Sequence, residues 1–166
     1  MAYRNKTYIA FDGDNDMHYY RLMTAWKASD GFSLNFHNAH ELNSARDSSE
    51  EESVKRQLRE RFANSKLLLV LIGERTRYLT KFVRWELEVA LRLGLPIVGV
   101  NLNNSRVMDD RCPPVLRDQL VVYTSFHHNI IEHALDNWPA NSARLRKDGI
   151  SGPHYYSNDV YGRLGL

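Results

Sequence analysis

The longest uninterrupted aliphatic run of this sequence lies in Lys66-Leu67-Leu68-Leu69-Val70-Leu71-Ile72-Gly73, from Leu67 to Ile72. A strand with one face in solvent alternates apolar and polar residues, whereas a strand covered on both faces is apolar at nearly every position. Strands of the second kind occupy the centre of parallel sheets that carry helices on both sides. We therefore predict a central parallel strand that ends at Gly73.

Strand and helix patterns alternate on both sides of this run. Short β-rich segments predict four further strands, at residues 7–11, 32–36, 96–102 and 121–126. Helical spacing of apolar residues predicts helices at residues 17–29, about 48–64, 80–93 and about 128–137, with Trp138-Pro139 ending or kinking the last. This alternation implies an α/β fold with an open parallel sheet of about five strands and helices on both faces.

Length and composition limit the function classes. The 166 residues predict one main domain, residues 1–146, and an extension, residues 147–166, that suits a lid, a packed arm or a disordered end. The formal net charge of +2 is too small for a nucleic-acid surface, and no apolar run is long enough to span a membrane. The single cysteine, Cys112, excludes an internal disulfide and fits a reducing cytoplasm, where we expect the protein.

The predicted helix at residues 80–93 carries an unusual carboxylate. At about 100° per residue, Arg84, Glu88 and Arg92 share one face, where Glu88 can pair with either arginine. Glu86 instead falls within the apolar arc, between Phe82 and Val89 among others. Burial of a carboxylate costs free energy and raises its pKa unless a polar group meets it. Glu86 is therefore either the floor of a pocket or a structural residue that tilts to water or pairs with a buried arginine.

Three loops are predicted to meet at the carboxyl edge of the sheet, where open α/β sheets bind ligands. They are Asp12–Asp16, Asn35–Asn43 and Gly73–Thr80. We interpret Asp14 and Asp16 as turn and helix N-cap residues. The sequence has no GxGxxG motif after the first strand, no phosphate-binding P-loop and no spaced set of metal ligands. We therefore expect no resident cofactor and no metal.

The candidate site combines aromatic walls with one carboxylate. Phe11, Phe36, Phe82 and Trp85 suit a flat base such as adenine or nicotinamide, although core packing is the simpler role for Phe11 and Phe82. A lone carboxylate beside a sugar suits cleavage of a glycosidic bond, because positive charge grows on the anomeric carbon.

These features resemble a TIR domain, in particular the bacterial TIR-like proteins of Thoeris antiphage defence. The resemblance rests on Tyr8-Ile9-Ala10-Phe11 with its Asp-rich loop, on Leu67–Ile72 with Gly73, and on Thr80-x-Phe82-Val83-x-x-Glu86-Leu87. It covers about residues 6–138. The family often has Trp at the position of Phe82, whereas this chain places Trp85 next to the glutamate.

The resemblance implies a flavodoxin-like three-layer sandwich that cleaves the nicotinamide–ribose bond of NAD, which is its substrate and not a cofactor. Glu86 would be the catalytic glutamate, and the loop Asn35–Asn43 would match the family's BB loop. Phe11 and Asp12 would line the nicotinamide side. The remaining candidate substrate-binding residues are Asn35, Phe36, Phe82 and Trp85. The ADP-ribose part would become a cyclic or conjugated signal that activates a separate effector protein, and self-association is expected.

Two other functions stay open at this stage. A non-catalytic TIR-like interaction module would use its helix faces and the Asn35–Asn43 loop for assembly, with Glu86 as a structural residue. A nucleoside deoxyribosyltransferase-like enzyme would use Glu86 to attack the sugar directly.

Overall fold

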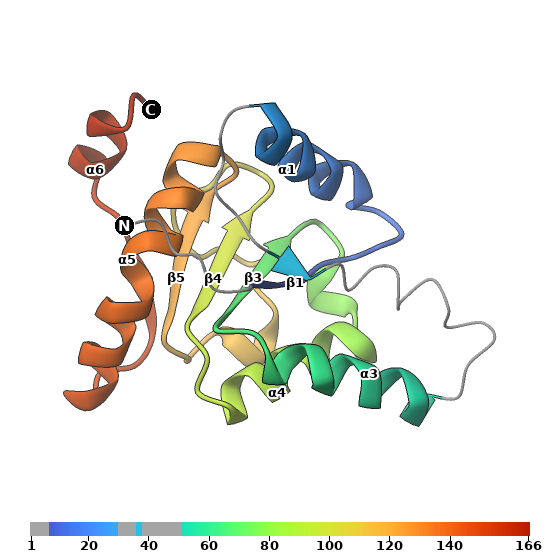
Figure 1. The fold of residues 1–166 in the computed structure, drawn as a ribbon. Helices are drawn as coiled ribbons and strands as arrows, with labels where there is room; N and C mark the ends of the chain where they lie inside the picture. Colours follow the sequence, from blue (N-terminus) through green and yellow to red (C-terminus); the bar gives the residue numbers. More distant parts are fainter. Residues whose placement is uncertain (1–6, 30–35, 38–50) are drawn as a thin grey trace.

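In the described part of the chain, six parallel strands form one sheet in the order β2-β1-β3-β4-β5-β6. The computed structural model describes residues 7–29, 36–37 and 51–166 (Figure 1). The strands are β1 (Thr7–Ala10), β2 (Phe36–His37), β3 (Leu67–Ile72), β4 (Ile97–Asn101), β5 (Val121–Ser125) and β6 (Pro153–Tyr155). The helices are α1 (Met17–Ser29), α3 (Glu51–Ala63), α4 (Phe82–Arg92), α5 (His128–Lys147) and α6 (Asn158–Arg163), with the short 3₁₀ helices η1 (Thr76–Tyr78) and η2 (Pro114–Leu116). This is the predicted α/β flavodoxin-like, TIR-like fold.

β3 is the central strand that the aliphatic run predicted. All six of its residues are buried, and it pairs with β1 through Leu68 and Tyr8 and with β4 through Leu69 and Val98. Because successive side chains point to opposite faces, Leu68 packs with α3 and α4, whereas Leu69 packs with α1 and α5. Figure 1 shows the resulting layers, with α3 and α4 together on one side of the sheet and α1 on the other.

The segment after residue 147 supplies a sixth strand that the sequence did not predict. β6 pairs in parallel with β5, with Val121 opposite Pro153 and Tyr123 opposite Tyr155. Beyond it, Tyr161 in α6 is fully buried, and its hydroxyl oxygen accepts a hydrogen bond of 3.2 Å from the Ser125 backbone N–H. Of the three alternatives for this segment, the structure therefore shows a packed arm. The domain boundary after residue 146 stays a prediction.

The end predicted for the last helix, near Asn137, was wrong. α5 continues through Pro139 to Lys147. Proline inside a helix costs about 3 kcal/mol, because it removes one backbone hydrogen bond and crowds the preceding turn. Trp138 is only 3% exposed and packs on the α1 side of the sheet together with Leu145. Burial of these side chains offsets the cost, which local sequence alone does not reveal.

Two expectations lie partly outside the described residues. The predicted strand at 32–36 is seen only as Phe36–His37, paired with β1. The predicted helix near residues 48–64 is described from Glu51, so its proposed capping residues Ser48 and Ser49 lie outside.

Candidate functional site

Glu86 faces the protein interior, which excludes the alternative that its side chain tilts to water. α4 begins at Phe82, shortly after the loop that follows β3, and Glu86 is 0% exposed. On the outer face of the same helix, Arg84 Nε donates to Glu88 Oε1 at 3.0 Å, so Glu88 pairs with the first of the two arginines considered. The burial of Glu86 is thus an observation, while its catalytic role stays a prediction.

The sheet separates two of the predicted aromatic residues. Phe11 stacks on Tyr20 of α1 with ring centroids 4.9 Å apart and the planes inclined by 9°. Phe82 belongs to the core on the opposite face, with α3 and α4. Both side chains are only 4% exposed. They are therefore core residues in this structure and do not form one continuous wall.

Trp85 points toward α3. Its ring meets Phe62 edge-on with centroids 6.2 Å apart, and two cations lie over the ring, Lys55 Nζ at 5.7 Å and Arg59 Cζ at 5.8 Å from its centroid. These cation–π contacts fix the indole between two helices. The stacking of a substrate base on Trp85 stays a prediction.

Asp12 organises the loop after β1. Its Oδ1 accepts hydrogen bonds from the backbone N–H groups of Asp14 at 3.0 Å and Asn15 at 3.3 Å. Its Oδ2 accepts a third from Asn15 Nδ2 at 2.7 Å, and the residue is 2% exposed. Asp12 therefore has a clear structural role, and the predicted contact with nicotinamide is untested.

Most of the Asn35–Asn43 loop lies outside the described residues. Asn35 lies outside the described residues, and Phe36 is described only as backbone in β2. The predicted substrate contacts of Asn35 and Phe36 therefore stay predictions.

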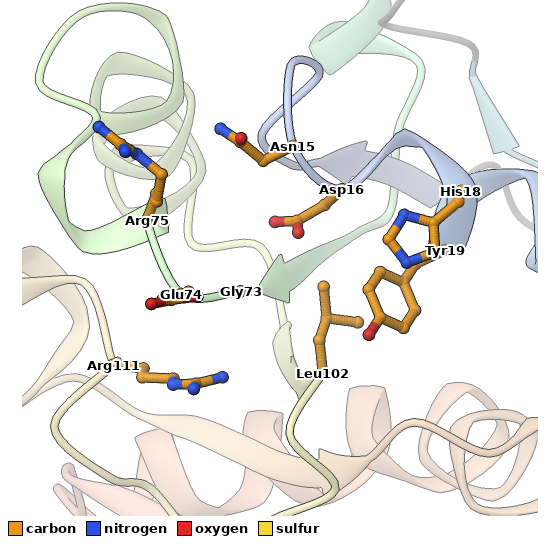
Figure 2. Close-up of a pocket in the computed structure, with 9 residues that line it drawn as sticks. All are labelled: Asn15, Asp16, His18, Tyr19, Gly73, Glu74, Arg75, Leu102 and Arg111. Atoms are coloured by element: carbon orange, nitrogen blue, oxygen red, sulfur yellow. The ribbon is translucent and has the colours of Figure 1, made fainter.

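A cavity of about 310 Å³ opens at the carboxyl edge of the sheet (Figure 2). It lies where β1 and β3 are neighbours and the chain order of the strands reverses, the usual ligand position in open α/β sheets. Glu86 is not among its lining residues. The lining comes from the loop before α1, from the first turn of α1 and from the segments after β3 and β4. It consists of Asn15, Asp16, His18, Tyr19, Gly73, Glu74, Arg75, Leu102 and Arg111.

Asp16 is the buried acid of this cavity. It is 7% exposed, and its Oδ2 has no hydrogen-bond partner among the described residues. Burial raises the pKa of the Asp16 carboxyl and nearby Asp12 raises it further, whereas His18 and Arg111 act to lower it. We predicted that the Asp16 side chain caps the N-terminus of α1, and this was wrong. The hydrogen bond from the Tyr19 N–H, 3.1 Å long, is accepted by the backbone oxygen of Asp16 and not by its carboxylate.

A family model described as "Thoeris protein ThsB, TIR-like domain" matches residues 8–107. This segment runs from β1 past β4 and contains the Glu86 motif. The chain belongs to this family of TIR-like domains. No curated protein matches it.

Membership in the Thoeris TIR-like family supports a TIR-like role in antiphage defence. All residues predicted for the site lie inside the matched segment, as do Asp16 and Gly73 of the cavity. Arg111 lies after its end, so this TIR-like chain completes the cavity with a residue from outside the match. Among the described residues, no helix has the length and apolar character needed to cross a membrane.

Proposed function

We propose that this TIR-like protein cleaves the nicotinamide–ribose bond of NAD with Glu86 as the catalytic carboxylate. The observation that carries the proposal is the complete burial of Glu86 on α4 in a chain of the Thoeris TIR-like family. A buried acid on an apolar helix face costs free energy, so its presence there favours a functional role.

The chemistry needs few groups. When the bond between the ribose C1′ and the nicotinamide nitrogen breaks, its electron pair leaves with nicotinamide and positive charge develops on the ribose. The Glu86 carboxylate stabilises this charge most strongly where water is excluded, because the local dielectric constant is low. It also accepts hydrogen bonds from ribose hydroxyls and so orients the sugar. Water, or a nucleophilic atom of the same or another molecule, then bonds to C1′, and an attacking O–H group loses its proton to the solvent.

The nature of that nucleophile decides the product. Attack by water gives linear ADP-ribose, whereas attack by another group gives a cyclic or conjugated ADP-ribose signal. We propose the second outcome for this Thoeris-family protein, with a separate effector protein as the receiver of the signal. The same proposal includes self-association of the chain. It also includes contacts of the substrate with Asn35, Phe36, Phe82 and Trp85.

Glu86→Gln tests the proposal, because it keeps the shape of the side chain and removes its charge. Glu88→Gln is the matched control, since Glu88 lies on the same helix but on its outer face, paired with Arg84. Purified proteins are mixed with NAD, at concentrations high enough for self-association, and nicotinamide and the other products are identified by mass spectrometry. We expect Glu86→Gln to lower nicotinamide release by about a hundredfold or more and Glu88→Gln to keep the parent rate.

Three results would contradict the proposal. Unchanged turnover by Glu86→Gln would remove Glu86 from the mechanism. No NAD cleavage by the parent protein at any concentration would favour the non-catalytic interaction module, and base exchange with deoxynucleosides would favour the deoxyribosyltransferase-like alternative.

A further inference from the structure

The cavity at the carboxyl edge of the sheet is lined by a carboxyl group and a guanidinium group that do not pair with each other. Asp16, the residue before α1, lines it on one side, and Arg111 reaches it from the segment after β4 (Figure 2). The two side chains are close enough for Arg111 to lower the pKa of Asp16, yet among the described residues neither of them forms an ion pair. Within the described part of the chain, the Arg111 guanidinium has no hydrogen-bond or ion-pair partner. Because the Asp16 carboxyl and the Arg111 guanidinium line the same cavity without contacting each other, a ligand can bind between them.

We propose that this cavity binds a small phosphorylated sugar, with its phosphate at Arg111 and a sugar hydroxyl donating to Asp16. The proposal does not rest on NAD cleavage, because it concerns a cavity to which Glu86 does not contribute.

The phosphate end follows from the positive groups around the cavity. Arg111 presents planar donors that match phosphate oxygens, and His18 and Arg75 line the same space. α1 has 13 residues and starts at Met17, so the positive end of its dipole also lies at this cavity. In Figure 2 the Arg75 guanidinium extends away from Asp16 while that of Arg111 turns inward, which makes Arg111 the main phosphate ligand.

The sugar end follows from Asp16. Asp16 is only 7% exposed, and neither of its carboxylate oxygens has a hydrogen-bond donor among the described residues. Oδ2 is enclosed against Gly73, so the oxygen that a ligand hydroxyl reaches from the cavity is Oδ1. A second phosphate there would place two negative charges together, so the group beside Asp16 is a hydroxyl. The volume of about 310 Å³ is at the lower end of the range for ligand pockets and suits one sugar ring with its phosphate.

Isothermal titration calorimetry with ribose 5-phosphate, ribose and inorganic phosphate tests this inference on the full chain. We expect ribose 5-phosphate to bind at least about tenfold more tightly than either fragment, because it makes both contacts at once. Arg111→Gln should weaken ribose 5-phosphate and inorganic phosphate alike, each by about tenfold or more. Asp16→Asn should weaken ribose 5-phosphate but leave inorganic phosphate unchanged or bound more tightly, since it removes a negative charge.

Arg92→Gln is the control, because Arg92 is exposed on α4 and does not line this cavity. Circular dichroism checks that each variant is folded, and Arg111→Gln carries the test if Asp16→Asn does not fold. The inference is overturned if ribose 5-phosphate does not bind at millimolar concentration, if free ribose binds equally well, or if Arg111→Gln binds as the parent does. No NAD is present in this measurement, so its outcome is separate from that of the glycohydrolase assay.

Discussion

The carboxylate of Asp16 lies directly against the α-carbon of Gly73, where the loop after β1 meets the loop after β3. A Cβ added at Gly73 would stand 2.7 Å from Asp16 Cγ and nearer still to Oδ2, a separation that real side chains do not adopt. Gly73 also donates its N–H to Thr76 Oγ1 at 2.9 Å, so its own backbone is held in place. The space for the buried acid therefore depends on the absence of a side chain at residue 73.

Gly73→Ala is expected to lower the free energy of unfolding by about 1–3 kcal/mol, because either Asp16 or the backbone must move. Urea denaturation measures this loss. Repeating the substitution in an Asp16→Ala background should recover most of it, since the overlapping carboxylate is then absent. Gly162→Ala is the control, because a Cβ there meets no atom within 4 Å. An equal loss in both backgrounds would show that the contact with Asp16 is not the cause.

The pH dependence of stability should report the burial of Asp16. Its pKa is raised in the folded protein, so the folded state holds this proton more tightly than the unfolded chain. Stability is therefore lost as pH rises from the unfolded pKa, near 3.8, through the higher folded pKa, and the loss then stays constant. The free energy of unfolding of Asp16→Asn minus that of the parent should therefore be larger at pH 7 than at pH 3.5. Urea denaturation across this range measures the difference, and a difference independent of pH would contradict the raised pKa.

Local sequence patterns predicted the centre of the fold and placed Glu86 on the apolar arc of its helix. Leu67–Ile72 is apolar at every position and Glu86 sits in an apolar arc, so neither prediction needed distant contacts. The loops Asp12–Asp16 and Gly73–Thr80 both line the cavity, so its position at the carboxyl edge was predicted. Arg111 was missed because it lies in a segment that looked merely irregular, and the place of Asp16 in the cavity was missed as well. The Asp-rich loop was the available signal, but an N-cap explained it equally well. The extent of α5 and the presence of β6 likewise depend on packing between distant segments.

Tyr161 ties the C-terminal arm to the end of β5, so its hydroxyl should matter for stability. That oxygen accepts from the Ser125 N–H at 3.2 Å, and the Arg106 guanidinium lies 4.0 Å from the ring centroid. Tyr161→Phe keeps the ring contact but leaves the N–H without this acceptor, which should cost about 1–3 kcal/mol in urea denaturation. Tyr155→Phe is the control, since Tyr155 is 44% exposed and should change stability by less than about 0.5 kcal/mol. Equal stability of the two variants would mean that the arm is held by its apolar contacts alone.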